Sequence, residues 1–205
     1  MTEKKTRAVY WIIKIFFVTS VMTNAQAGSI SAENISDRLV SAAIERTKSG
    51  VIYNGAYKRI AYPMGDVNPR FGVCTDVIIR AFRKIDIDFQ QVIHEDMVDN
   101  FAEYPKLWGL ERPDRNIDHR RVPNIRTFLK RQSAALPVTS DAKDYKAGDI
   151  VTWMLPGNKP HIGIVVKEKY NQEIPLIVHN VGLGPRKENF LFKYPITGHY
   201  RYLSN

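Results

Sequence analysis

The sequence has one cysteine, Cys74, among its 205 residues, so the chain has no internal disulfide. Linkers rich in glycine, serine or proline are absent, and so are repeats of solenoid length. These absences favour a single domain. The hydrophobic fraction of 44% and the charged fraction of 25% are ordinary for a globular protein. A core can therefore form without disulfides or metals.

The chain also lacks an apolar run long enough to cross a bilayer. The longest run, residues 9–22, is split by Lys14 and falls short of the ~20 residues that a spanning helix needs. A basic segment (residues 4–7) precedes it, and Ala25-Gln26-Ala27 follows it with the small-x-small pattern of signal-peptidase sites. We expect residues 1–27 to be a cleaved signal peptide, with an uncleaved anchor as the alternative. No cysteine lies near the cleavage site to carry a lipid.

The charge balance is positive but scattered. The formal net charge is +9, and residues 1–27 hold four of the positive charges and one negative charge, which leaves +6 on the mature chain. Such a balance favours an anionic environment such as a cell envelope, and a mildly basic solvated surface explains it equally well. We expect a monomer that binds no nucleic acid and, after cleavage, no membrane.

Helical patterns come first in the mature chain and strand patterns follow. Helices are expected over residues 34–49, with Asn34 as the N-cap, over 73–84 and 88–103, and from Pro123 onward. Strands are expected over residues 148–155, 161–168, 175–181 and 196–203. Residues 104–121 are expected to form a long irregular loop between the third and the fourth helix. The order predicts an α+β fold in which N-terminal helices pack on an antiparallel meander.

Cys74 opens the second predicted helix, in the stretch RFGVCTDVIIRAF. It shares a helix face with Ile78 and Phe82, so it should face the sheet. The unpaired N–H groups and the dipole of a helix start favour a thiolate, which is what a nucleophilic cysteine needs. We therefore expect a lowered thiol pKa, with burial as an inert side chain as the alternative. Asp76 is expected to point to solvent and to serve the helix N-terminus.

Two histidines lie on neighbouring predicted strands. His161 opens HIGIVV and His179 ends LIVHN. If these strands form an antiparallel hairpin, the start of one lies beside the end of the other. The two rings are then neighbours, which suits a base oriented by a second polar group.

These motifs resemble a known family. GVCTDVIIRAF followed by AGDIVTW, HIGIVV and VHN is similar to the NlpC/P60 superfamily of papain-like cysteine peptidases. HEDM, YPKLWG, PDRNIDHRRVPN, VHNVGLG and GHYRY resemble the blocks of the DUF1287 group within it, over roughly residues 35–203. The resemblance implies a papain-like catalytic domain over residues 28–205, in the periplasm. It also implies Cys74 as nucleophile, His161 as general base and His179 as the residue that orients the base, with Asn180 as the alternative.

Members of this superfamily cut peptidoglycan stem peptides, commonly at the γ-D-glutamyl–meso-diaminopimelate bond. The resemblance therefore implies an exported cysteine peptidase that acts through a thioester. An N-acetylmuramoyl-L-alanine amidase, a transferase with the same machinery and a non-catalytic wall-binding module are the alternatives. Where many members have Asp-Cys-Ser/Thr-Gly, this chain has Val73 before the cysteine and Thr75 and Asp76 after it.

Further side chains are candidates for substrate contacts. His119, Arg120 and Arg121 are expected to line the cleft and to pair with stem-peptide carboxylates, with a structural ion-pair loop as the alternative. The backbone N–H of Cys74 is the expected oxyanion donor, and Tyr53 is the candidate for a second donor.

Two histidines and two aspartates are the candidates for a metal site. His94 and His119 lie near Asp96 and Asp118 in the sequence, but their spacings match no standard zinc motif. We expect no metal and no cofactor.

Overall fold

The computed structural model describes residues 24–203, with side chains from residue 35 onward. Its helices are α1 (Asn24–Arg46), α2 (Cys74–Arg83), α3 (Phe89–Asn100) and α4 (Val122–Arg131), with the 3₁₀ turns η1 (Phe101–Glu103), η2 (Asp118–Arg120) and η3 (Ala142–Asp144). Its strands are β1 (Ile52–Tyr53), β2 (Phe71–Gly72), β3 (Ala135–Leu136), β4 (Ile150–Leu155), β5 (Lys159–Tyr170), β6 (Ile174–His179), β7 (Arg186–Glu188) and β8 (Ile196–Tyr200). Among the described helices, none is long and apolar enough to span a membrane.

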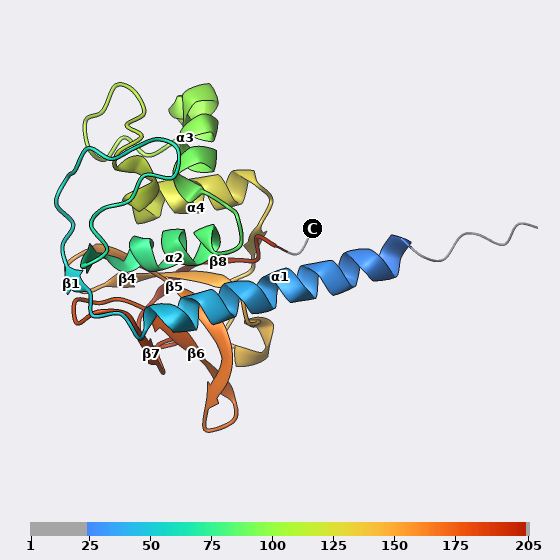
Figure 1. Ribbon diagram of the computed structural model, residues 1–205. Helices are drawn as coiled ribbons and strands as arrows, with labels where there is room; N and C mark the ends of the chain where they lie inside the picture. The colour runs from blue at the N-terminus through green and yellow to red at the C-terminus, as the bar shows by residue number, and fades with distance from the viewer. Residues whose placement is uncertain (1–23, 204–205) are drawn as a thin grey trace, which may run out of the picture.

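The larger sheet is antiparallel and has the strand order β3-β8-β4-β5-β6-β7. The helices lie on one side of it, with α2 next to the strands and α3 farther out (Figure 1). The α+β prediction is confirmed. The expectation of a simple meander is wrong at β8, which returns to pair with β4, Val151 opposite His199. β5 pairs with one edge of β4, and the backbone N–H and C=O groups on the other edge need a partner. β8 supplies that partner.

The predicted helices around Cys74, after Asp88 and at Pro123 are confirmed. The first helix differs, because α1 begins at Asn24 and not at an N-cap on Asn34. No proline interrupts residues 24–34, so nothing ends the helix there. The start of α1 projects away from the rest of the fold (Figure 1). Most of the predicted signal peptide lies outside the described residues, and the expected cleavage after Ala27 falls near the start of α1.

Apolar residues fill both faces of the sheet. On the helix side, Ile162 and Ile164 of β5 join the core formed with α1, α2, α3 and α4. On the opposite side, Trp153 and Val165 pack with Phe190, from the segment that links β7 to β8. This alternation is the period-2 pattern of a strand covered on both faces. It places successive residues of β5 in two different environments.

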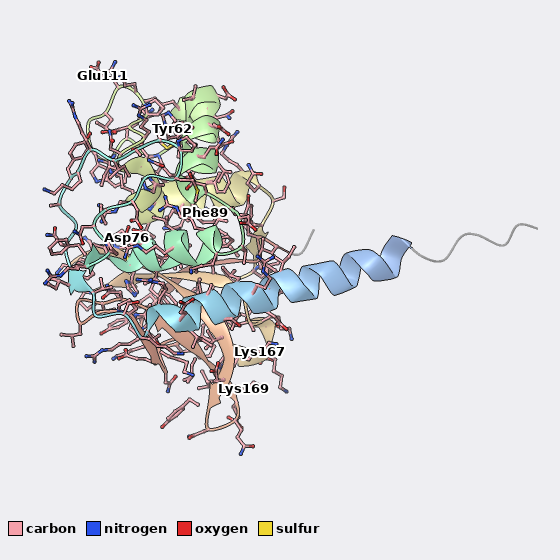
Figure 2. The ribbon with its side chains drawn as sticks, viewed as in Figure 1. Tyr62, Asp76, Phe89, Glu111, Lys167 and Lys169 are labelled. Carbon is pink, nitrogen blue, oxygen red and sulfur yellow. The ribbon has the colours of Figure 1, made fainter. Side chains whose placement is uncertain are left out.

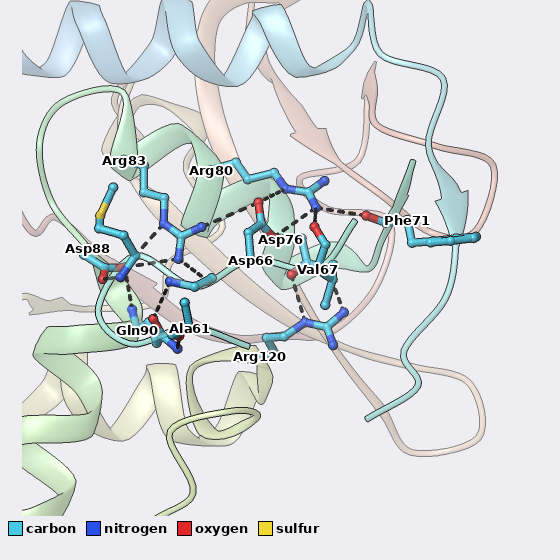
Figure 3. A network of polar contacts seen from close by, with 12 residues as sticks. Ala61, Asp66, Val67, Phe71, Asp76, Arg80, Arg83, Asp88, Gln90 and Arg120 are labelled. Atoms are coloured by element: carbon cyan, nitrogen blue, oxygen red, sulfur yellow. Dashed lines mark hydrogen bonds and ion pairs between the residues drawn. The ribbon is translucent and has the colours of Figure 1, made fainter. Parts of the chain in front are cut away.

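Buried ion pairs tie the loops to α2 (Figure 3). Asp76 accepts hydrogen bonds of 2.9 Å from both Nε and Nη2 of Arg120, and both side chains are 3% exposed. The Asp76 carboxylate also accepts the backbone N–H of Val73 at 2.7 Å, and Thr75 Oγ1 donates to the carbonyl of Arg120. Asp76 therefore accepts a hydrogen bond at the N-terminus of α2, as expected. The expectation that it points to solvent is wrong, because Arg120 covers it.

A second buried acidic group anchors the last strand. Asp149 accepts hydrogen bonds from Arg201 through Nε and Nη2, and it lies 2.7 Å from Nε2 of His199. These bonds join the start of β4 to the end of β8. His199 thus helps to hold β8 against β4.

The Asp76–Arg120 pair allows a stability test. Arg120→Met should lower the free energy of unfolding in urea by about 3–5 kcal/mol, because it leaves the Asp76 carboxylate charged and buried without its cation. Arg70→Met is the matched control at an exposed arginine, with an expected change within about 0.5 kcal/mol. The double variant Asp76→Leu/Arg120→Met should recover much of the loss. Equal stability of Arg120→Met and Arg70→Met would contradict this account of the pair.

Candidate active site

Cys74 is the first residue of α2, after the extended residue Val73. Its side chain is 5% exposed and faces β5, beside the backbone of Ile162. Helix phasing brings this about, because Ile78 and Phe82 on the same face of α2 are fully buried in the core. The predicted orientation of Cys74 toward the sheet is confirmed.

A cavity of about 290 Å³ reaches Cys74. Its walls come from β1 and the segment after it, the start of α2, the loop of residues 104–121, the start of α4 and the start of β5. The lining residues are Tyr53, Gly55, Val73, Cys74, Trp108, Ile117, Arg120, Arg121, Val122, Pro123 and Pro160. Larger cavities of about 480 and 580 Å³ lie along the same loops but do not include the cysteine.

The thiol is held in its protonated form. Burial, with a smaller contribution from the nearby Asp76 carboxylate, raises the pKa of Cys74 to about 12. The backbone amides of Ile162, Thr75 and Cys74 itself act in the opposite direction without reversing the effect of burial. The expected lowering of the thiol pKa is therefore wrong for this state. The loss of water around the sulfur outweighs the N–H groups of the helix start.

The two strand histidines meet as predicted. Nε2 of His161 lies 2.9 Å from Nδ1 of His179, and both rings are buried. Burial lowers the pKa of His161 to about 3, helped by His179, and lowers the pKa of His179 to about 4, helped by Lys193. Both rings are therefore neutral at neutral pH. One nitrogen of each ring is then a hydrogen-bond acceptor, as a general base requires.

The rings and the thiol lie on different faces of β5. Ile162 faces α2, whereas His161 faces Trp153 and Phe190, at ring-centroid distances of 6.0 and 5.4 Å. Within the described part of the chain, no hydrogen bond joins the Cys74 sulfur to either imidazole. The two groups approach each other at the start of β5, where Pro160 lines the thiol cavity.

Glu188 extends the pair of histidines and was missed by sequence reasoning. Its Oε2 lies 3.3 Å from Nε2 of His179, a long contact without hydrogen-bond alignment in this state. Glu188 pairs opposite Ile177 in the register of β6 and β7, so it shares a face with His179. The strand β7 has only three residues and no apolar alternation, so no sequence signal marks it.

Gly163 makes room for His179. The two residues are direct partners across β5 and β6. A Cβ on Gly163 would lie 2.6 Å from Cγ2 of Ile177 and 3.1 Å from Cβ of His179. The glycine of the HIG motif therefore allows the two strands to present His161 and His179 at hydrogen-bond distance.

The predicted substrate residues separate into two groups. Tyr53 and Arg121 line the thiol cavity, and the Arg121 guanidinium lies 4.0 Å from the ring centroid of Trp108. Arg120 also borders the cavity, but its charge is paired with Asp76, so the structural alternative holds for it. His119 is wrong as a cleft residue, because it is 3% exposed and burial lowers its pKa to about 4.

Asn180 does not orient the base and does not line the thiol cavity. It is 1% exposed, and its Oδ1 accepts the backbone N–H of Gly182. His179 holds the position next to His161 that Asn180 was considered for. The reason is strand alternation, since adjacent residues at the end of β6 point to opposite faces.

Metal ligation finds no support among the described side chains. No group of three or more His, Cys, Asp or Glu residues in residues 35–203 is placed to hold a metal ion. Asp96 accepts hydrogen bonds from Tyr104 and Arg131, and Asp118 pairs with Arg121. Both carboxylates are thus used within the fold.

Comparison with known proteins gives the following matches. A family model described as "Domain of unknown function (DUF1287)" matches residues 40–202. "Uncharacterized protein YijF" of Escherichia coli (strain K12) is 46% identical over 164 residues, which are 80% of each chain. Two solved structures, of NlpC1 and NlpC2 from Trichomonas vaginalis, are similar over 82% of this chain, with identities of 17% and 18% and TM-scores of 0.43 and 0.42. The chain spans less than half of these two proteins, 44% and 46%.

The protonation state of Cys74 can be tested by alkylation. With a neutral alkylating reagent, the reaction rate of the folded protein should rise roughly tenfold per pH unit up to about pH 10, because only the thiolate reacts. In urea the same thiol should level off above about pH 8.5, its ordinary pKa. The unfolded chain is the matched reference for the folded one. A plateau below pH 8.5 in the folded protein would show that the thiolate is stabilised instead.

Proposed function

The chain belongs to the DUF1287 family, and we propose that it is a cysteine peptidase that hydrolyses amide bonds in cell-wall peptides. The observation that supports this most is the convergence at the start of β5. There the buried thiol of Cys74 borders a cavity that Pro160 also lines, and the next residue of β5, His161, contacts His179 at the end of β6. A nucleophile, a base and a group that orients the base are the parts that amide hydrolysis through a thioester requires.

The reaction begins from two neutral groups. His161 removes the proton of the Cys74 thiol as the sulfur attacks the amide carbonyl carbon. The C–N bond then breaks, the amine leaves with the proton held by His161, and a thioester remains. Water attacks the thioester, His161 takes a proton from that water, and the thiol returns with the carboxylic acid product. The first step requires Nδ1 of His161 within hydrogen-bond distance of the Cys74 sulfur, with the contact between Nε2 of His161 and His179 kept.

Glu188 sets the tautomers of both histidines in this mechanism. A neutral His179 that donates its Nε2–H to Glu188 has an acceptor at Nδ1. His161 must then donate its Nε2–H to that nitrogen, across the 2.9 Å contact. This leaves Nδ1 of His161 without a proton, and Nδ1 is the atom that accepts the thiol proton. Glu188 is thus a positioning residue that acts through two rings.

Two donors suit the developing oxyanion. The backbone N–H of Cys74 lies in the first turn of α2, where it has no helical partner. Tyr53 lines the same cavity, and burial raises its pKa to about 12. Tyr53 therefore keeps its proton, and its hydroxyl can donate a hydrogen bond to an oxyanion.

The bond that we propose is cut is the γ-D-glutamyl–meso-diaminopimelate bond of the stem peptide, after export of the protein to the periplasm. Arg121 supports a carboxylate-bearing substrate, because its guanidinium borders the thiol cavity and is held by Trp108 and Asp118. The expected signal peptide supports export. A muramoyl amidase or a transferase would use the same thioester and differ in the bond or in the acceptor.

One observation favours a second candidate, a wall-binding module without catalysis. The thiol pKa of about 12 and the lack of a hydrogen bond between sulfur and imidazole, within residues 35–203, describe an unreactive cysteine. A family member that kept the cavity and lost the chemistry would have this site. It would bind peptidoglycan equally well with or without Cys74.

Digestion of muropeptides separates these functions. The wild-type protein should release peptide fragments from purified muropeptides, and Cys74→Ala should lose the activity, because the sulfur forms the intermediate. Mass spectrometry of the products identifies the bond: endopeptidase, amidase and transferase reactions give different masses. Equal products from wild type and Cys74→Ala would refute the peptidase proposal, and binding without products from either would support the wall-binding module.

Glu188 is tested by a graded pair of variants. Glu188→Ala should lower kcat about tenfold, less than the 10²–10⁴-fold loss typical of removing an acid–base group, as in His161→Ala. Glu188→Gln keeps an oxygen that accepts the His179 N–H, so it should restore most of kcat. KM should stay unchanged, since Glu188 does not line the thiol cavity. If Glu188→Gln were as impaired as Glu188→Ala, the tautomer argument would be wrong.

A further inference from the structure

A second cavity lies along the loops that form the thiol cavity. Its volume is about 580 Å³. Its lining residues are Tyr57, Arg59, Ile60, His94, Leu110, Arg112, Pro113, Asp114, Arg115 and Asn116. Tyr62 and Glu111, neighbours of the lining residues in sequence, lie at the end of the molecule beyond α2 and Asp76 (Figure 2). The long loop of residues 104–121 therefore encloses a space that the proposed chemistry at Cys74 does not use.

The walls of this cavity are rich in unpaired positive charge. Arg59, Arg112 and Arg115 are exposed, and within the described residues none of them forms an ion pair with a carboxylate. Asp114 is the single acidic residue of the lining, and its Oδ1 accepts the backbone N–H and the Nδ2–H of Asn116. That carboxylate is used within its own turn. Three guanidinium groups and one carboxylate leave a formal charge of +2 on the walls.

The cavity is held in shape by contacts between its two loops. Asn116 accepts the backbone N–H of Ile60 and donates to the hydroxyl of Tyr57, so residues 57–60 and 110–116 are tied together. The Arg115 guanidinium lies 5.5 Å from the ring centroid of Tyr62. His94 adds a buried ring nitrogen, Nδ1, that has no hydrogen-bond partner. The lining thus contains a ring nitrogen without a hydrogen-bond partner as well as charged groups.

The two cavities are successive along the same pair of chain segments. Residues 53–55 border the thiol cavity and residues 57–60 border the second one. On the other side, Trp108 and Ile117 border the first cavity, and Leu110 and Asn116 the second. A long ligand with its amide at Cys74 can follow these segments from one cavity to the other.

We propose that the cavity of Arg59, Arg112 and Arg115 is a subsite that binds carboxylate or phosphate groups of the substrate, away from the bond that is cut. Guanidinium groups bind such oxyanions through paired, charge-assisted hydrogen bonds. This inference rests on the proposed function for the identity of the substrate. The binding site itself needs no catalysis and can be tested without it.

The probes are inorganic phosphate and tricarballylate, titrated into the full chain at constant ionic strength. Constant ionic strength is needed because salt screens exposed charges. Nitrogen NMR signals of the arginine side chains should shift with saturation for Arg59, Arg112 and Arg115. The double variant Arg112→Gln/Arg115→Gln should bind about tenfold more weakly, since it removes two charge-assisted contacts. Arg70→Gln removes the same kind of exposed charge outside the cavity and should bind like wild type.

Each outcome has a defined meaning. Tighter binding of tricarballylate identifies peptide carboxylates as the ligand, and tighter binding of phosphate identifies phosphate groups. Equal dissociation constants for wild type and the double variant, or no saturable binding of either probe, would overturn the subsite. The single variants Arg59→Gln and Arg112→Gln, each at an exposed position, repeat the test if the double variant unfolds. If neither probe binds but hydrolysis still depends on Cys74, the subsite proposal has failed. If a probe binds but hydrolysis does not depend on Cys74, the peptidase proposal has failed.

Discussion

The buried ion pair between Asp76 and Arg120 positions the start of α2 and the loop that forms the cavities of the candidate site. It holds the loop of residues 104–121 against the start of α2, and that loop supplies walls to both cavities. The same carboxylate accepts the N–H of Val73, the N-cap residue, and so helps to define the start of α2 at Cys74. Because two opposite charges are buried together, the loop and the helix start cannot separate without exposing an uncompensated charge. The ion pair therefore fixes the loop against the helix, and apolar side chains only line the site.

Burial has a chemical consequence for the catalytic groups. It raises the pKa of Cys74 and lowers the pKa of His161, so both rest in their neutral forms. A preformed thiolate–imidazolium pair would need two charges in a dry site, with Asp76 near the sulfur. A neutral pair avoids that cost and transfers its proton as the sulfur attacks. In the proposed mechanism the tautomer of His161 decides activity, which is why we propose a role for Glu188 through its contact with His179.

Local patterns account for much of what the sequence predicted correctly. The apolar spacing after Cys74 and the proline at position 123 are local signals, and α2 and α4 follow them, as α3 follows the helix predicted from Asp88. The adjacency of His161 and His179 follows from a hairpin between neighbouring strands. The pairing of β8 with β4 depends on an edge that no local pattern marks. The contact between Glu188 and His179 depends on the three-residue strand β7.

The sequence by itself determined the helix that presents Cys74 and the strands that present the two histidines. These features depend on residues close together in the chain, whose periodicity and size are readable without the fold. Only the tertiary structure decided the charge states and the partners. It paired Arg120 with Asp76, buried His119, turned His161 to the face opposite α2 and left Arg59, Arg112 and Arg115 around an open cavity. Such outcomes depend on burial and on distances between residues far apart in sequence, because desolvation and Coulomb energies are set by the whole fold.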